Sequence, residues 1–266
     1  MKMYEICGID LKKIQAQQTK ILKAFDKICR ENNLRYSIEG GTLLGAYKYQ
    51  GFVPWDDDVD VVMPRKDYER FLSIAPKVQN GMSVHTYKND KYMVLNYCKY
   101  RMNGTVYKEK LNAHLTKMDH GLFIDVFPLD SVIPEKLQKQ KKKVRLYFKI
   151  RWSKLGYRNG NIVDKLLSFI PDKWLVYRIE KAVTKYNGKN SPWIYEICNA
   201  NDKFNPIPEE WFDTLVNMPF NGILVKAVGE YRQYIQSRFG DISGEPPEKD
   251  QKPSHQIIEV KLKDEY

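Results

Sequence analysis

Four aspartates lie within five residues of this chain and lead directly into an apolar, β-branched segment. Residues 56–63 read Asp-Asp-Asp-Val-Asp-Val-Val-Met. If residues 58–63 form a strand, its two-residue period places Asp58 and Asp60 on one face and buries the other face in a core. Two neighbouring carboxylates repel each other unless a cation lies between them, and hard oxygen ligands suit Mg²⁺ or Mn²⁺. Acids are also common in solvated turns, but their direct entry into an apolar strand favours a metal site.

A glycine-rich segment precedes the acids. Gly40, Gly41 and Thr42 follow a short strand predicted at residues 36–38, and a helix is predicted to begin at Thr42. The N-terminus of a helix directs several backbone N–H groups at one point, which suits a phosphate. A double glycine alone marks many turns. Together with the acids it predicts a metal-dependent site of phosphate transfer, with Gly40, Gly41 and Thr42 binding the substrate.

A third carboxylate lies inside an apolar stretch. Asp125 is the only charged residue of residues 121–128. Burying an unpaired carboxylate is costly or forces it to become neutral, so Asp125 requires a partner. Two partners are open: the cation predicted at the aspartate cluster, or Lys99 and Arg101 on a neighbouring predicted strand. The first is favoured and makes Asp125 a metal ligand or a catalytic residue.

Lys99 and Arg101 lie two residues apart and therefore share one face of their predicted strand. Both side chains suit the charge of a phosphate, and arginine binds it in bidentate fashion. An ordinary surface ion pair is the alternative. We predict both as substrate-binding residues. Asp130, two residues after a proline, is expected in a turn or a helix cap.

Composition excludes several classes of protein. The chain has 266 residues, of which 42% are apolar, and this predicts a folded globular protein with a substantial core. The sequence contains no run of 18 apolar residues, so no membrane-spanning helix is expected. The N-terminus lacks the apolar segment of a signal peptide. Four cysteines without CxxC spacing predict reduced thiols in the cytoplasm. The histidines have no ligand-like spacing, and we assign them no metal.

The net charge of +11 is concentrated in one segment. Nine Lys and Arg residues lie within residues 136–154, interleaved with apolar and aromatic side chains. Such a segment suits an anionic membrane surface or a polyanionic substrate, and a partly solvated helix is the alternative. No nucleic-acid-binding motif accompanies the charge, so nucleic acid is not expected as a partner.

Secondary structure is predicted from periodicity and from capping residues. A helix is expected from Asp10, as its cap, to about Glu31, and further helices at 163–170, 174–186 and 228–239. Strands are expected at 83–87, 92–101 and 121–127. From Asp241 onward the chain is polar and is expected to be loosely ordered.

The motifs together resemble the LicD family, which includes bacterial phosphocholine transferases and is similar to the fukutin group. The resemblance is carried by residues 39–68, EGGTLLGAYKYQGFVPWDDDVDVVMPRKDY, and by residues 122–130, LFIDVFPLD. Lys99, Arg101 and Thr105 resemble the block between these two. Residues 231–255 are also similar, whereas residues 131–220 match only loosely. One departure is Tyr49, where many members of the family carry histidine.

This resemblance implies an α/β (α+β) fold with a nucleotidyltransferase-like mixed sheet flanked by helices and a mainly helical C-terminal part. It implies that Asp58, Asp60 and Asp125 hold Mg²⁺ or Mn²⁺ and that Asp56 supports them. The implied reaction moves a phospho-alcohol, most often phosphocholine, from a CDP-linked donor to a sugar hydroxyl of a surface glycan such as lipopolysaccharide, teichoic acid or capsule. CMP is released. The acceptor is expected to be lipid-linked, and the enzyme to lie in the cytoplasm, peripheral to the inner face of the plasma membrane.

Three regions are predicted: a catalytic core at 1–130, a mainly helical, basic region on the acceptor side at 131–240, and a polar tail at 241–266. Two other functions remain open. A GT-A glycosyltransferase also uses an Asp-x-Asp motif with a nucleotide sugar, although few residues precede the acids here and that class has no Gly-Gly-Thr element. A non-catalytic scaffold protein of surface-polysaccharide assembly is the second alternative.

Overall fold

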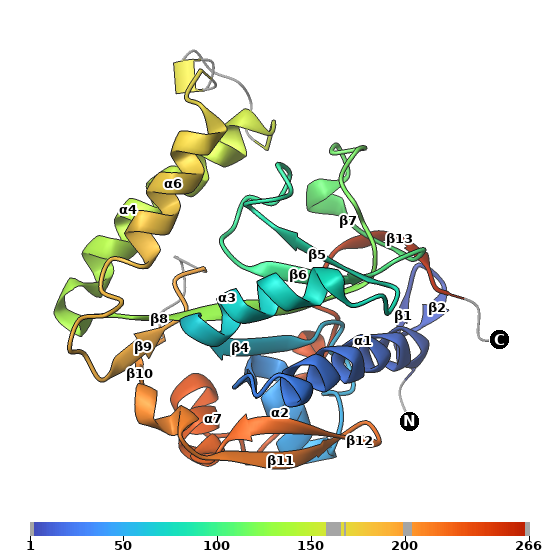
Figure 1. The fold of residues 1–266 in the computed structure, drawn as a ribbon. Helices are drawn as coiled ribbons and strands as arrows, with labels where there is room; N and C mark the ends of the chain where they lie inside the picture. The colour runs from blue at the N-terminus through green and yellow to red at the C-terminus, as the bar shows by residue number, and fades with distance from the viewer. Residues whose placement is uncertain (1–2, 158–165, 168, 199–203, 264–266) are drawn as a thin grey trace.

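A seven-stranded mixed sheet forms the centre of the protein (Figure 1). The computed structural model describes residues 3–157, 166–167, 169–198 and 204–263. The strands run in the order β10–β9–β8–β4–β3, with β6 and then β5 on the other side of β8 from β4. Strands β4 and β8 are parallel, and the other described pairs of this sheet are antiparallel. Their bounds are β3 Ser37–Ile38, β4 Asp60–Pro64, β5 Met82–Thr86, β6 Cys98–Met102, β8 Phe123–Ser131, β9 Trp193–Tyr195 and β10 Ile207–Pro208.

Three smaller antiparallel pairs surround the central sheet. They are β1 Glu5–Ile6 with β2 Ile9–Asp10, β7 Val106–Glu109 with β13 Ile257–Lys261, and β11 Leu215–Phe220 with β12 Ile223–Val228. The pairing of β13 with β7 brings the end of the chain beside its middle (Figure 1). The tail from Asp241 therefore contains an ordered strand, and the expectation of a loosely ordered tail was wrong.

The described residues also form helices. They are α1 Leu11–Glu31, α2 Gly40–Tyr49, α3 Arg65–Ile74, α4 Pro134–Lys154, α6 Asp172–Val183 and α7 Tyr231–Phe239, with short 3-10 turns at η1 Ala75–Lys77, η2 Lys110–Asn112, η3 Glu209–Phe212 and η4 Glu248–Asp250. Asp10 caps α1 by accepting a hydrogen bond from the backbone N–H of Lys12 at 2.9 Å, as predicted. The buried face of α1 packs against the sheet and α3. The predicted mixed α/β fold is confirmed.

The C-terminal part contains more strand than its sequence pattern suggested. Helix α6 agrees with the predicted helix at 174–186, and α7 ends at Gly240 as expected. Most of the predicted helix at 163–170 lies outside the described residues. The segment 207–228, for which no strand was predicted, forms β10, η3, β11 and β12. Packing of β12 against β3 and α1 provides the tertiary contacts that override local propensity.

Helices α4 and α6 pack together as an arm that projects from one end of the sheet (Figure 1). A second hydrophobic cluster, separate from the main core, holds this arm together and includes Val144, Tyr147 and Phe148 from α4 with Leu175 and Ile179 from α6. No helix of the described part of the chain combines the length and the apolar composition that crossing a bilayer requires.

Asp130 lies inside β8 rather than in a turn or a helix cap, so that expectation was wrong. Its carboxylate is fully buried and accepts two hydrogen bonds from the Arg65 guanidinium, at 2.8 and 2.5 Å, and one from Asn187 at 2.6 Å. A bidentate guanidinium satisfies a buried carboxylate well. Asp130 therefore joins the sheet to α3 and to the segment that follows α6.

Candidate active site

Four ionisable side chains lie in one row: three on neighbouring strands and one just after the end of β3. Asp60 of β4 lies directly opposite Asp125 of β8, and Asp125 lies opposite Lys99 of β6. On the other side, the N–H of Glu39 donates to the carbonyl of Asp60 at 2.9 Å, so the row continues beyond β3. Paired residues of neighbouring strands point to the same face of a sheet. Glu39, Asp60, Asp125 and Lys99 therefore share one face.

Lys99 is the direct partner of Asp125. Its ammonium nitrogen lies 3.1 Å from Oδ1 and donates a hydrogen bond to Oδ2 at 3.2 Å. Both side chains are buried, and Oδ1 accepts no hydrogen bond from the described residues. Burial raises the pKa of Asp125 to about 6 even though Lys99 acts in the opposite direction. The sequence left two partners open for Asp125, and in the structure Lys99 is paired with it.

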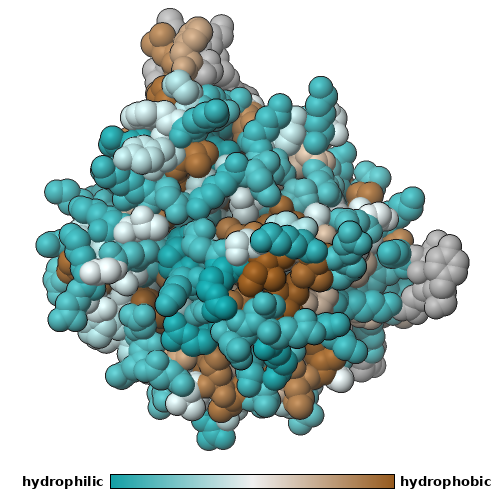
Figure 2. Space-filling model, viewed as in Figure 1, coloured by the Kyte–Doolittle hydropathy of each residue, from teal (hydrophilic) through white to brown (hydrophobic). Residues whose placement is uncertain are grey.

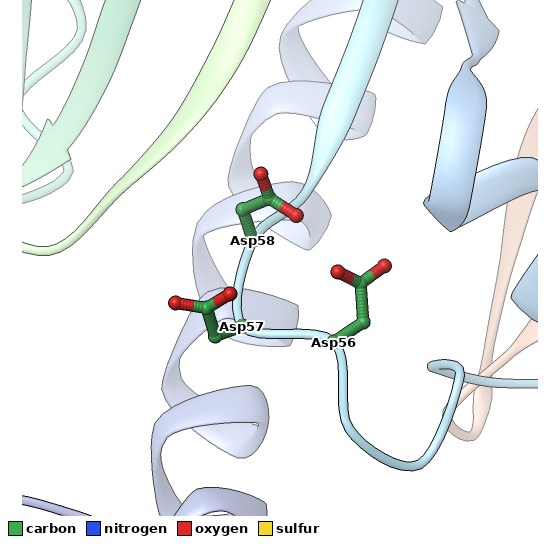
Figure 3. A group of neighbouring side chains, drawn as sticks. All are labelled: Asp56, Asp57 and Asp58. Carbon is green, nitrogen blue, oxygen red and sulfur yellow. The ribbon is translucent and has the colours of Figure 1, made fainter. Parts of the chain in front are cut away.

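The aspartates at 56–58 lie in a loop, because β4 begins at Asp60 and not at residue 58 as predicted. The side-chain amides of Gln15 and Gln18 on α1 donate to the carbonyls of Asp56 and Asp57, both at 2.8 Å. These two bonds fix the loop to the helix instead of to a neighbouring strand. Figure 3 shows the three side chains of residues 56–58 projecting from this loop.

The acidic groups are close enough to repel one another. Carboxylate oxygens of Asp56, Asp57 and Asp58 lie within 4.8 Å of one another. Burial raises the pKa of Asp60 well above its ordinary value, and the charges of Asp58 and Asp125 raise it further. Burial and the neighbouring Asp58 likewise raise the pKa of Asp56. Buried carboxylate oxygens in excess of nearby cations are the donor set that a hard divalent ion requires.

Asp57 differs from the other acids because its oxygens are already used. It accepts hydrogen bonds from the N–H and hydroxyl of Ser254, at 2.8 and 2.9 Å, and from the hydroxyl of Tyr107 at 2.9 Å. The ring of His255 lies 3.3 Å away. Burial raises the pKa of Asp57, but these partners, His255 foremost, bring it below its ordinary value. Asp57 therefore fastens the C-terminal tail to the acidic loop.

The glycine turn touches the same carboxylates. Helix α2 begins at Gly40, two residues before the predicted start, and a Cβ added to Gly41 would collide with the carboxylate of Asp56. Gly40 has a φ of +52°, and a Cβ there would lie 3.6 Å from the carboxylate of Asp60. The hydroxyl of Thr42 accepts from the N–H of Asp60 at 2.9 Å. The N-terminus of α2 and the acids thus form one site.

Arg101 is buried on the same strand face as Lys99. Its Nη1 donates to the carbonyl of Gly121 at 2.6 Å, and its guanidinium lies 5.1 Å from the centre of the Phe123 ring. Its Nε has no hydrogen-bond partner within the described residues. Burial lowers the pKa of Arg101 despite the acids around it. Its assignment as a phosphate ligand stays a prediction.

Three site residues were missed by the sequence analysis. Glu39 is buried, accepts a hydrogen bond from Tyr234 and lies 3.3 Å from the Arg238 guanidinium. Glu196 follows directly after β9. Extending the register of β8 and β9 by one residue places Glu196 on the face of the sheet that carries Asp125. Burial, and then Glu39, raise the pKa of Glu196 to about 8. His255 is the third missed residue. Of the three, only Glu39 had a sequence signal, because it directly precedes the double glycine.

Acids from adjacent parallel strands, next to a glycine turn that opens a helix, are the arrangement expected of a nucleotidyltransferase-like domain. Residues 33–151 match the sequence model described as the LicD/FKTN/FKRP nucleotidyltransferase domain. This match contains the glycine turn, the aspartate cluster, Lys99, Arg101 and Asp125. This part of the chain therefore resembles the nucleotidyltransferase domain of the LicD family, the family that the motifs indicated.

Curated relatives agree with this assignment. The chain is 27% identical over 265 residues to the lipopolysaccharide cholinephosphotransferase LicD of Haemophilus influenzae, covering 93% of this chain and 96% of that protein. It is 40% identical over 58 residues to an uncharacterised protein of Rickettsia typhi, covering 22% of this chain and 19% of that protein. It is 30% identical over 125 residues to mannosyltransferase regulator 4 of Saccharomyces cerevisiae, covering 46% of this chain and 10% of that protein.

Replacing Gly41 by alanine is expected to weaken divalent-metal binding. The new Cβ would displace the Asp56 carboxylate while leaving the backbone in place. Loss of a group that supports metal ligands typically lowers affinity by about tenfold or more. Mn²⁺ titration followed by electron paramagnetic resonance measures the effect. Gly244→Ala is the matched control, since a Cβ there meets no atom within 4 Å; equal affinity of both variants would contradict the contact.

The stability that His255 contributes is expected to decrease at alkaline pH. Burial lowers the pKa of His255, but its bond to Asp57 and the charge of Asp58 bring it to about 9. Since the folded-state pKa exceeds the unfolded value of about 6.5, the stabilisation is complete below that value and is lost as pH rises through about 9. Urea unfolding of the wild type and His255→Gln should therefore differ most near pH 6 and least near pH 10.

The control for this measurement is His114→Gln. Its Nε2 lies 2.8 Å from the carbonyl of Leu155 rather than from a carboxylate. A stability difference for His255→Gln that stayed constant from pH 6 to pH 10 would show that the ring acts through packing and not through its charge.

Proposed function

We propose that this protein is a metal-dependent phosphotransferase that moves phosphocholine from a CDP-linked donor to a sugar hydroxyl of a cell-surface glycan and releases CMP. The row of Asp60, Asp125 and Lys99 carries this proposal. It combines two acids on adjacent parallel strands with a cation, beside the N-terminus of α2. The match of residues 33–151 to the LicD model and the printed activity of the Haemophilus relative support a phosphotransferase acting in lipopolysaccharide synthesis.

In this proposal Asp58, Asp60 and Asp125 hold Mg²⁺ or Mn²⁺, and Asp56 supports them. Two observations favour such an ion. Burial and the neighbouring acids raise the pKa of Asp60, and Oδ1 of Asp125, 3.1 Å from the Lys99 ammonium, accepts no hydrogen bond from the described residues. When bound, a divalent ion neutralises the charge of a diphosphate. Asp57 is not included because its oxygens are already hydrogen-bonded.

The residues of the chain have separate roles in the transfer. Backbone N–H groups at Gly41 and Thr42 bind the phosphates of the donor. Asp125 accepts the proton of the acceptor hydroxyl as the new oxygen–phosphorus bond forms and the bond to CMP breaks. Lys99, which already lies beside Asp125, offsets the negative charge on the leaving CMP, together with Arg101. A nucleotide-sugar donor is less favoured because the family match is to a nucleotidyltransferase domain.

The arm formed by α4 and α6 is proposed to contact an anionic membrane that carries a lipid-linked acceptor. Two of the nine cations of the basic segment do not face solvent: Lys141 and Arg151 are buried. The exposed lysines of α4 lie at 136, 139, 142, 143 and 149. Those at 139, 142, 143 and 149 follow a helical period on one side, around the 56% exposed Leu146.

The arm also exposes apolar and aromatic side chains. Phe169, Trp174 and Tyr177 are 82%, 44% and 58% exposed. Figure 2 shows that the face in view is largely hydrophilic, with hydrophobic residues at the outer end of the arm as well as in the middle and lower part of the face. Lysines beside exposed aromatic residues suit the interface of an anionic leaflet. A location in the cytoplasm, peripheral at the inner face of the plasma membrane, belongs to the same proposal.

Asp60→Asn is expected to lower the transfer rate by at least about a hundredfold, because it removes a charge from the reacting centre without changing shape. The assay measures CMP release from CDP-choline with a lipopolysaccharide acceptor. Asp213→Asn, at a side chain that is 74% exposed, is the control. Chelation should abolish transfer, and Mg²⁺ or Mn²⁺ should restore it. Near-normal turnover of Asp60→Asn, or activity in chelator, would overturn the proposal.

Membrane contact predicts salt-sensitive flotation with vesicles of phosphatidylcholine and phosphatidylserine, and none with phosphatidylcholine alone. Replacing the exposed lysines at 139, 142, 143 and 149 by glutamine should abolish it. A variant with four exposed lysines elsewhere replaced, at 13, 23, 27 and 66, keeps the same net charge and should still float. Equal loss in both variants would indicate a general charge effect rather than docking by the arm.

A further inference from the structure

A small aromatic cavity adjoins the acidic row on the side of Lys99. Its volume is about 90 Å³. Its walls include Tyr92 and Tyr97 from the segment before β6, Glu109 from the end of β7, and Trp152 and Tyr157 from the end of α4 and the turn after it. Lys99 also lines it, so the cavity lies next to the Lys99–Asp125 pair.

Hydrogen bonds hold the walls of this cavity in place. The hydroxyl of Tyr157 donates to Oδ1 of Asn112 at 2.5 Å, and Nδ2 of Asn112 donates to the carboxylate of Glu109 at 2.8 Å. The rings of Trp152 and Tyr157 are 6.3 Å apart and inclined at 49°. One amide side chain therefore positions both an aromatic wall and the carboxylate.

The segment that carries the other two rings is fixed as well. The buried guanidinium of Arg151 donates to the carbonyls of Val94 and Lys91, at 3.4 and 3.3 Å. These bonds tie the segment around Tyr92 to the end of α4. The ring of Tyr97 packs 4.7 Å from that of Phe127 on β8. The cavity is thus built into the junction between the arm and the sheet.

The charges around the cavity favour a cation. Lys99 pairs with Asp125 and also acts on Glu109, so it faces two carboxylates, of which Glu109 lines the cavity. Burial raises the pKa of Glu109, but Lys99, His255 and Arg101 bring it below its ordinary value, so the group is ionised at neutral pH. Aromatic faces attract cations, and they do so most strongly when the cation is poorly hydrated.

Size distinguishes this cavity from a larger one on the other side of the acids. The larger one holds about 620 Å³ and is lined by Gly41, Asp56 and the segment around 239–246. A single water requires about 10–15 Å³ of such volume, so 90 Å³ accommodates a group of a few heavy atoms. It is too small for a nucleoside or a sugar ring.

We propose that this cavity binds the quaternary ammonium end of the donor and so selects choline among phospho-alcohols. The proposal rests on the phosphotransferase function above and specifies its substrate. In phosphocholine two carbons separate the nitrogen from the phosphate ester oxygen. Lys99 borders both the cavity and Asp125, so a phosphate beside Lys99 places the trimethylammonium group among Tyr92, Tyr97, Trp152 and Tyr157. Glu109 supplies the counter-charge.

The test is calorimetric titration of CDP-choline, CDP-glycerol and CMP into the protein with Mg²⁺. The wild type should bind CDP-choline about tenfold more tightly than CDP-glycerol. Trp152→Leu should remove this difference and leave CMP affinity unchanged, whereas Trp152→Phe should retain most of it. Glu109→Gln, which preserves shape and the bond from Asn112, should weaken CDP-choline alone. Trp193→Leu, at a residue 38% exposed on β9, is the control.

Outcomes separate this inference from the function it rests on. Equal binding of CDP-choline and CDP-glycerol by the wild type, or equal loss of CMP and CDP-choline in Trp152→Leu, would overturn the choline cavity. Transfer of phosphocholine from CDP-choline by the same protein would still support the proposed function. If Trp152→Leu does not fold, Glu109→Gln decides the matter. Failure of the wild type to bind any of the three ligands would overturn the function and the cavity together.

Discussion

The parallel pairing of β4 with β8 is the constraint on which the site depends. It places the half-buried Asp60 opposite the buried Asp125, where two like charges are unstable without compensation. The surrounding structure supplies part of that compensation: Lys99 lies on the next strand, and the N-terminus of α2 lies beside the acids. The raised pKa of Asp60 indicates that compensation by protein groups is incomplete. Such an excess of acidic groups suits a cation. The free-energy cost of bringing the acids together is already part of the free energy of folding, so cation binding does not add it again.

The acidic loop is rigid because segments from both ends of the chain hold it. Gln15 and Gln18 of α1 bind its carbonyls, and Ser254 and His255 bind the carboxylate of Asp57. The tail reaches this position through the pairing of β13 with β7. Side chains held by a second layer of contacts keep their geometry when another group binds beside them. The tail is therefore part of the site, although it is far from the aspartates in sequence.

The sequence predicted the parts of the site that follow from local pattern. A single acid within an apolar run marked Asp125, and its row with Asp60 follows from two strands of this kind being neighbours. The start of β4 was placed at Asp58 because side-chain period says nothing about the glutamines of α1 that hold the loop. His255 and Glu196 could not be identified, since each joins the site through pairing with strands far away in the sequence. The pairing of strands that are distant in sequence depends on the whole fold, and the local sequence around a residue does not predict it.

The pattern of charges in α4 could not predict which of its cations are exposed and which are buried. Lys141 donates to the hydroxyl of Tyr195 at 3.0 Å, and Arg151 binds the carbonyls before β6. Both cations thereby attach the arm to the central sheet, whereas the lysines on the opposite side of α4 face solvent. Both faces of α4 thus carry positive charge, but the cations of one face bind other parts of the protein and those of the other face are exposed to solvent. Because Arg151 fixes the segment that carries Tyr92, the position of the arm and the shape of the aromatic cavity are linked through a single buried guanidinium.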